Sequence, residues 1–278
     1  MTSPRDLLRI HYLLPKRSWG QNFLGDPDLL RRIAEAVELQ PGDAVVELGA
    51  GLGHLTRALA ATGARVVAVE RDRDLVKVLE GENLPGVQLV AGNATDLKFA
   101  ELAGVPEVAV AGNLPYHLSS PILFEVLDQY ASVTRAVFTL QEEVVDRIFA
   151  APGTRESGVL TVLLQHHFDV EKLFRIPSHL FHPPPKVESA VVRLRRLPRP
   201  RAEVRSEERF RRVVKAAFAQ RRKTLLNSMR SASGLATPEQ LAAALQSAGI
   251  DPTRRGETLG IEELAAIERA LGEPRVDP

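Results

Sequence analysis

Short runs rich in Val and Ala recur between helical stretches over the first two thirds of the chain, and this pattern constrains the fold most. The runs are continuously apolar rather than alternating, which is typical of parallel strands covered on both faces. Strands that alternate with helices in this way predict an α/β fold with an open sheet. The runs are AVVEL at 44–48, RVVAVE at 65–70, VQLV at 87–90, EVAVAGN at 107–113 and AVFTL at 136–140.

Two later strand candidates follow one another without a helix between them. They are DVEKLFRI at 169–176 and VESAVVRLR at 187–195, joined by a Pro-rich connection. Parallel neighbours need a long crossover, usually a helix, so this arrangement predicts an antiparallel end to the sheet.

The strand pattern stops after the segment RRLPRPR at 195–201. We therefore predict a first domain over 1–197, which would hold the cofactor and the target, and a small all-helical domain over 198–278. A chain of 278 residues has room for one large domain and a smaller one.

The helical domain has three helix signals. Apolar residues at helical spacing predict a helix over 208–229, and TPEQ at 237–240 is a capping box with Pro at the first helical position. The segment IEELAAIERAL at 261–271 predicts a last helix, for which Gly272 is a good C-cap.

Composition excludes several function classes. The chain has no cysteine, which excludes disulfides, thiolate zinc sites, iron–sulfur clusters and thiol nucleophiles. Its histidines lack metal-binding spacing, and we expect the adjacent His166 and His167 to point in two directions on any regular element. The sequence therefore predicts no metal site.

Hydropathy argues against a membrane protein. No apolar run approaches the roughly 18 residues that a spanning helix needs. The N-terminus lacks the continuous apolar region and small-residue cleavage site of a secretory signal. We expect a cytoplasmic protein, and we expect it to be a monomer.

Basic residues concentrate in one region of a chain whose formal net charge is only +1. Residues 186–230 carry 15 Lys or Arg against 4 Asp or Glu, a local net charge of +11. Such a stretch can face a polyanion, although Arg-rich helices can also be merely solvated. Charge alone leaves nucleic-acid binding open.

A glycine-rich turn leads from the first strand run into a helix, in VVELGAGLGHLTRAL at 45–59. Gly49, Gly51 and Gly53 allow tight turning and close approach of a ligand to the backbone. Dinucleotide-binding dehydrogenases use a similar loop, but they need a small residue where this chain has His54.

Carboxylates beside this turn favour S-adenosylmethionine over NAD. Glu47 precedes the glycines, at a place typical of methyltransferase loops, and Glu70 closes the second strand, where a carboxylate can accept hydrogen bonds from both ribose hydroxyls. The third strand ends near Asn93 and Asp96, either of which can contact the adenine of the cofactor.

The fourth strand ends in Asn113-Leu114-Pro115-Tyr116, the most specific feature of the chain. Adenine N6 is a poor nucleophile because its lone pair is delocalised into the ring. An Asn oxygen and a carbonyl beside Pro can accept the N6 hydrogens and localise that lone pair, while Tyr116 stacks on the base. The alternative is a strand that turns at proline, with Tyr116 in the core.

Two phenylalanines are further aromatic candidates. Phe181 precedes a stiff triple proline that can present its ring as a stacking surface. Phe138, in the fifth strand run, is expected to be buried.

Five blocks of sequence stand out between residue 16 and the helical tail. They are KRSWGQNFL at 16–24, VVELGAGLGHLT at 45–56, NLPYHLSSPIL at 113–123, FTLQEEVVDRI at 138–148 and FHPPPKVESAVVRL at 181–194. In their order and spacing these blocks resemble the KsgA family of small-subunit ribosomal RNA adenine dimethyltransferases.

The resemblance implies a Rossmann-like S-adenosylmethionine-dependent methyltransferase sheet with a helical C-terminal domain. It also implies roles for individual residues. At the target amine and base these are Asn113, Leu114, Pro115, Tyr116 and Phe181, and at the cofactor Gln21, Asn22, Leu24, Gly49, Gly51, Glu70, Asn93 and Asn113.

The chain departs from the family pattern at three positions. Asn93 stands where Asp is usual, so either the neutral amide contacts the cofactor, which we favour, or Asp96 does. Trp19 replaces a different residue before GQNFL, which bears on the packing of that segment. His182 stands where Thr is frequent, and we attach no consequence to it.

The resemblance implies dimethylation of two adjacent adenines near the 3′ end of the 16S RNA in the small ribosomal subunit. The residues themselves support only an adenine amine in nucleic acid. Two alternatives share these features: a large-subunit RNA adenine methyltransferase, and a ribosome-assembly binding factor for which methylation is secondary.

Overall fold

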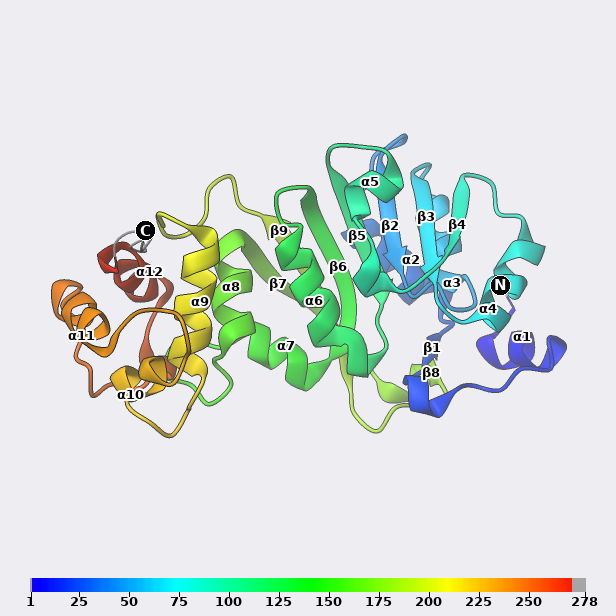
Figure 1. Cartoon of the computed structure of the whole chain (residues 1–278). Helices are drawn as coiled ribbons and strands as arrows, with labels where there is room; N and C mark the ends of the chain where they lie inside the picture. The colour runs from blue at the N-terminus through cyan, green and yellow to red at the C-terminus, as the bar shows by residue number, and fades with distance from the viewer. Residues whose placement is uncertain (1, 272–278) are drawn as a thin grey trace. The chain divides into compact units, whose positions relative to one another are not determined.

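The structure is a computed structural model that describes residues 2–271 (Figure 1). The chain divides into two compact units. The first comprises Met1–Val145 and Asp169–Arg196, and the second comprises Asp146–Phe168 and Leu197–Pro278. The sequence had placed 146–168 in the first domain, whereas its contacts group it with the helical tail.

A seven-stranded sheet forms the centre of the first unit, in the order β4-β3-β2-β5-β6-β9-β7. The pairs among β4, β3, β2, β5 and β6 are parallel, and β9 runs antiparallel to β6. Both the open α/β sheet and its antiparallel end are therefore confirmed. The strands are β2 Ala44–Leu48, β3 Arg65–Glu70, β4 Val87–Ala91, β5 Val108–Asn113, β6 Val133–Gln141, β7 Phe168–Ile176 and β9 Ser189–Arg196.

The central strands form where they do because both of their faces are covered. Every residue of β2 is buried, and so is every residue of β3 after Arg65. Helices lie between the strands in the sequence and supply the covering apolar surface. In the first unit they are α1 Pro4–Ile10, α2 Pro27–Ala36, α3 His54–Ala60, α4 Arg73–Glu82, α5 Phe99–Ala103 and α6 Ser119–Asp128.

The direction of the strand order reverses between β2 and β5. From β2 the chain adds β3 and β4 on one side, and then β5 and β6 on the other, as Figure 1 shows. In an open α/β sheet a crevice forms at such a reversal, beyond the carboxyl ends of the strands. A short two-stranded pairing joins β1 Phe23–Leu24 to β8 Phe181–His182 in the same unit.

The second unit is helical over its described part. Its helices include α8 Val159–His167, α9 Glu207–Phe218, α10 Leu225–Arg230, α11 Pro238–Ser247 and α12 Ile261–Ala270, while α7 Glu142–Phe149 crosses the boundary between the units. The capping box is confirmed, since Thr237 and Gln240 exchange their side-chain hydrogen bonds. The C-cap predicted at Gly272 lies outside the described residues.

The single helix predicted over 208–229 is wrong, because the chain turns between α9 and α10. The buried hydroxyl of Ser228 donates to the carbonyl of Ala216 at 2.8 Å and accepts the amide of Gln220 at 3.0 Å. These bonds satisfy groups at the end of α9 that a continuous helix would have paired. The amide of Leu225 donates to the carbonyl of Arg254 at 2.6 Å, which fixes the start of α10.

A buried carboxylate joins the two ends of the helical tail. Glu268 of α12 has no exposed surface and accepts the amides of Arg205 at 2.9 Å and Ser206 at 3.1 Å. Arg209 Nε also donates to it, at 2.8 Å. These bonds hold the start of α9 against α12. Within residues 2–271, no helix combines the length and the apolar character needed to cross a bilayer.

Candidate functional site

A pocket of the first unit opens at the carboxyl ends of β2, β3 and β5, at the predicted crevice. It brings together residues from blocks that lie far apart in the sequence. The candidate residues in its lining are Gln21, Asn22, Leu24, Gly49, Gly51, Glu70, Asn93, Asn113, Leu114, Pro115 and Tyr116. Trp19, Glu47 and His54 line it as well.

The glycine turn after β2 forms one wall of the pocket. Gly51 has a φ of +60°, a left-handed conformation that side chains rarely adopt, and a Cβ there would lie 3.3 Å from the ring of Phe23. Its amide donates to Glu70 Oε2 at 2.8 Å. His54 begins α3 and places Nε2 2.9 Å from the carbonyl oxygen of Thr2.

Glu70 ends β3 with its carboxylate held by the backbone. It is 6% exposed, and its second oxygen accepts the amide of Asp72 at 2.8 Å. Burial raises the pKa of Glu70, against the effect of its backbone hydrogen bonds. The carboxylate therefore has a fixed orientation in the pocket wall.

Glu47 lies in the same wall and is more buried than Glu70; it is the penultimate residue of β2. Its side chain is 1% exposed, and its Oε2 has no hydrogen-bond partner. Burial raises the pKa of this carboxyl from its usual value of 4.5 to about 7. An unpaired acceptor beside a pocket is a group that a bound cation or hydrogen-bond donor would satisfy.

Two residues after β4, Asn93 and Asp96, were candidates for contact with the adenine of the cofactor, and the structure distinguishes between them. Asn93 lines the pocket, whereas Asp96 does not. The amide nitrogen of Asn93 donates to Thr95 Oγ1 at 2.8 Å, and its oxygen is buried without a partner. This arrangement leaves the Asn93 oxygen available as an acceptor.

The segment before β1 is tied to the pocket by Asp72, which the sequence analysis missed. Lys16 Nζ lies 2.6 Å from Asp72 Oδ1 and 2.9 Å from Asp74 Oδ2, and Gln21 Nε2 donates to Asp72 Oδ2 at 2.8 Å. Burial alone would raise the pKa of Asp72, but the hydrogen bonds from Lys16 and Gln21 lower it. The charged run after Glu70, Arg-Asp-Arg-Asp, was the only signal in the sequence.

The ring of Trp19, in this segment, contacts two cations. The guanidinium carbon of Arg71 is 4.2 Å from its ring centroid, and Lys16 Nζ is 5.0 Å away. Cation–π contacts of this kind hold an aromatic ring in place. Trp19 thus packs the segment against residues that follow β3.

Asn113, the last residue of β5, is oriented by the same segment. Its amide nitrogen donates to the main-chain oxygen of Asn22 at 2.9 Å. This bond fixes which way the amide faces and leaves Oδ1 as the group that can accept a hydrogen bond from a ligand. Tyr116 Oη lies 2.7 Å from Ser189 Oγ, and burial raises the pKa of this phenol. Tyr116 is half-buried in the lining of the pocket, not in the core.

Like Asp96, Phe181 is a candidate that the structure does not bring into the pocket lining. Its side chain is 3% exposed and packs in the core of the first unit, while its backbone pairs with Leu24. Phe138 is fully buried, as predicted.

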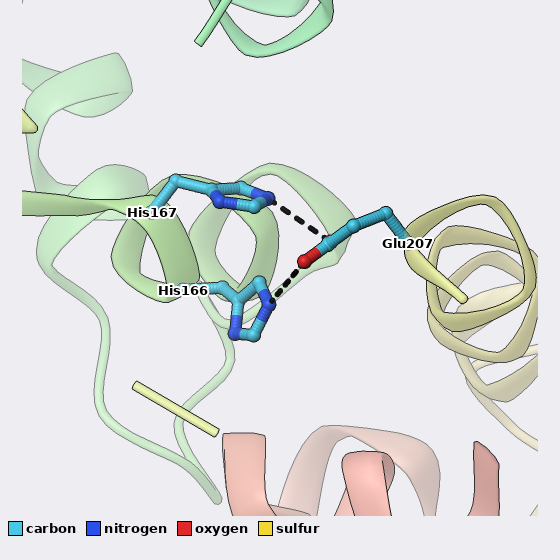
Figure 2. A group of neighbouring side chains, drawn as sticks. All are labelled: His166, His167 and Glu207. Carbon is cyan, nitrogen blue, oxygen red and sulfur yellow. Dashed lines mark ion pairs between the residues drawn. The ribbon is translucent and has the colours of Figure 1, made fainter. Parts of the chain in front are cut away.

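His166 and His167 end α8 in the second unit and do not line this pocket. The expectation that they point in two directions is wrong, because both rings turn toward Glu207 (Figure 2). Consecutive residues on a helix differ by only about 100° in direction, so one carboxylate beside the helix can reach both.

A comparison with models of known protein families shows to which family the chain belongs. Residues 14–271 match the family model described as Ribosomal RNA adenine dimethylase. The chain belongs to this family. The resemblance seen in the sequence is therefore confirmed.

Individual relatives agree with this dimethylase family. Ribosomal RNA small subunit methyltransferase A of Myxococcus xanthus is 64% identical over 272 residues, which cover 98% of this chain and 96% of that protein. The structure of the 23S rRNA methyltransferase ErmE is similar with a TM-score of 0.65 at 29% identity, covering 91% of this chain and all of that one. A dimethyladenosine transferase from Plasmodium falciparum shares the fold, with a TM-score of 0.71 at 21% identity over 88% of this chain and 95% of that chain. The Rossmann-like methyltransferase fold is thereby confirmed.

The raised pKa of Glu47 gives a pH-dependent stability. Between about pH 4.5 and pH 7 the folded chain keeps a proton on Glu47 that the unfolded chain loses, so stability falls as pH rises through this window. We expect the Glu47→Gln variant to lose less stability between pH 5 and pH 8 than the wild type, by a difference of up to about 3 kcal/mol. Urea denaturation of the ligand-free protein at both values measures it. Glu80→Gln, at an exposed position of α4, is the control and should keep the wild-type slope.

Proposed function

We propose that this dimethylase transfers methyl groups from S-adenosylmethionine to N6 of two adjacent adenines near the 3′ end of the 16S RNA, forming N6,N6-dimethyladenosine. Family membership supports the reaction class, and the Myxococcus xanthus relative is named for the small subunit. The observation that carries the proposal is the orientation of Asn113, whose amide oxygen is left to accept a hydrogen bond in the pocket.

The pocket residues fit the cofactor. Glu70 would accept hydrogen bonds from the ribose hydroxyls and Asn93 from the adenine amine, and both acceptors are already held in place. The buried oxygen of Glu47, which has no partner in the structure, would accept a hydrogen bond from the amino acid end of the cofactor. When bound, S-adenosylmethionine supplies an electrophilic methyl group on a sulfonium. Gln21, Asn22 and Leu24 would cover it.

At the target, Asn113 and the main-chain carbonyl of Leu114 would accept the two N6 hydrogens in the first transfer. In the second transfer one of these acceptors would hold the single N6 hydrogen that remains. Accepting both hydrogens localises the nitrogen lone pair away from the ring, which makes the amine nucleophilic. Tyr116 would stack on the base and hold it in the pocket. The amine loses its proton after transfer, so no strong general base is needed. Phe181 would have to leave the core to stack on the base.

We assign RNA binding to the basic stretch 186–230 and to the helical second unit. Lys215 of α9 is exposed, and so are Arg222 and Lys223, which follow α9. Lysine and arginine side chains at such positions can contact phosphates without reading sequence. The monomeric state and the cytoplasmic location stay predictions.

A large-subunit RNA substrate is the second candidate, because ErmE is similar over nearly the whole chain. The test is transfer of labelled methyl groups to unmethylated small subunits, to large subunits and to a DNA duplex, followed by nucleoside analysis. Dimethyladenosine in small subunits alone is the expected result. Label in large subunits would favour the second candidate, and no transfer to any of them would favour an assembly factor.

The link between Asp72 and residues 16–21 predicts an effect on cofactor affinity. The Asp72→Asn variant loses the charge that holds Lys16, so residues 20–24 should cover the cofactor less well. We expect its dissociation constant for S-adenosylmethionine to rise about 10-fold, close to the effect of losing one hydrogen bond to a charged group. Calorimetric titration measures it. The matched control is Asp74→Asn, which removes the more exposed partner of Lys16 and should change affinity less.

A further inference from the structure

Two buried histidines and a carboxylate meet in the second unit, outside the pocket described above. His166 and His167 end α8 and Glu207 begins α9 (Figure 2). His166 has no exposed surface and His167 is 7% exposed, whereas the Glu207 side chain is 39% exposed. One side of the cluster is therefore open to solvent.

The distance between the His166 ring and Glu207 is long for a hydrogen bond. His166 Nε2 lies 3.5 Å from Glu207 Oε1, and His167 Nε2 lies 3.3 Å from Oε2. Hydrogen bonds to nitrogen are usually shorter, at about 2.7–3.2 Å. A tetrahedral Zn²⁺ with bonds of about 2.0–2.1 Å keeps its ligand atoms roughly 3.3–3.4 Å apart. The two His–Glu207 separations are close to that spacing but run to different carboxylate oxygens. One ligand atom from each of the three residues lies within 4.8 Å of the others, so a bound ion would draw them closer together.

The ring of His166 supplies a second, independent observation that points to a metal ion. Both of its ring nitrogens are buried, and neither has a hydrogen-bond partner. The ring of Phe210 packs against it, with the ring centroids 4.5 Å apart. A buried imidazole without hydrogen bonds carries an uncompensated desolvation cost. A metal bond to Nε2 would offset that cost.

We propose that His166, His167 and Glu207 bind a divalent transition-metal ion of the Zn²⁺ type. Two imidazoles and one carboxylate are ligands that suit Zn²⁺, and a water molecule would complete the tetrahedron on the exposed side. The ion joins the end of α8 to the start of α9. It thereby fastens segment 146–168 to the helical tail, with no part in methyl transfer.

The test uses the untagged full-length chain, stripped with a chelator and dialysed against Zn²⁺ or Mg²⁺. We expect about one Zn²⁺ per chain, a higher melting temperature with Zn²⁺, and no effect of Mg²⁺, which prefers oxygen ligands. Co²⁺ bound in place of Zn²⁺ should show the absorption bands of a tetrahedral nitrogen and oxygen site. No bound Zn²⁺ in the wild type would overturn the proposal and would leave the cluster as an ion pair.

Variants locate the site. Glu207→Gln and His167→Gln should each weaken Zn²⁺ binding on the order of 100-fold or more, because each removes a ligand. Glu208→Gln changes the same charge one residue later on α9, and His179→Gln removes an exposed histidine of the first unit. Both controls should bind Zn²⁺ as the wild type does. Equal binding by all four variants would place the metal elsewhere and refute the assignment, and if a ligand variant does not fold, the Co²⁺ spectrum of the wild type decides.

Discussion

The Asn113→Ala variant should lose methyl transfer by about 10²–10³-fold, the usual effect of removing one oriented hydrogen-bonding group from a reacting centre. Its affinity for S-adenosylmethionine should change by less than about twofold, because the cofactor contacts assigned to Glu70 and Asn93 remain. We expect the loss because the variant removes Oδ1, the acceptor proposed to act beside the Leu114 carbonyl. Single-turnover methylation of small subunits and calorimetric titration of the cofactor measure the two quantities.

The Asn113→Ala variant also distinguishes methyl transfer from subunit binding, and thereby an enzyme from an assembly factor. Asn113→Ala should still bind small subunits, since the basic residues assigned to RNA contact are unchanged. Unchanged turnover would remove the role proposed for Asn113. A large loss of cofactor affinity would instead assign Asn113 to holding the segment around Asn22, to which its amide is bonded.

The largest effect on stability is expected at Glu268. Replacing it with Ala leaves the amides of Arg205 and Ser206 and the guanidinium of Arg209 without their buried partner. Removing one partner of a buried ion pair costs about 3–5 kcal/mol. We expect a loss of that size in the free energy of unfolding of the second unit, measured by hydrogen exchange of the amides of α9 and α12.

The control for this prediction lies on the same helix. Glu262 pairs with Arg269 at 2.7 Å, but its side chain is 67% exposed. Exposed pairs of this kind contribute about 0–1 kcal/mol, so Glu262→Ala should change little. Equal losses in the two variants would contradict the importance given to burial at Glu268.

The parts of the fold that the sequence predicts well are those set by local pattern. Strands β2 and β3 were placed at their observed bounds because two buried faces leave a continuous apolar run. The break between α9 and α10 escaped prediction because Ser228 and the Arg254 carbonyl create it, and neither changes the apolar spacing of 208–229. No shift in composition marked segment 146–168 as part of the helical tail.

In the candidate site, too, the features set by a local motif could be predicted, whereas those set by contacts between distant residues could not. The glycine turn and the residues Asn113 to Tyr116 could be predicted because each is one continuous motif beside a strand end. Asp72 could not, since its importance comes from Lys16 and Gln21, more than fifty residues earlier in the chain. The burial of Phe181 results from pairing between β1 and β8, which are too short to show a pattern.

The hydrogen bond from Asn113 to the Asn22 carbonyl spans 91 residues of sequence. It makes the orientation of the Asn113 amide depend on residues 20–24, the segment that would cover the cofactor. Changes that displace residues 20–24 would remove the partner of the Asn113 amide, so its oxygen would no longer be held toward the target base. We therefore expect variants that loosen this segment to slow methyl transfer as well as to weaken cofactor binding.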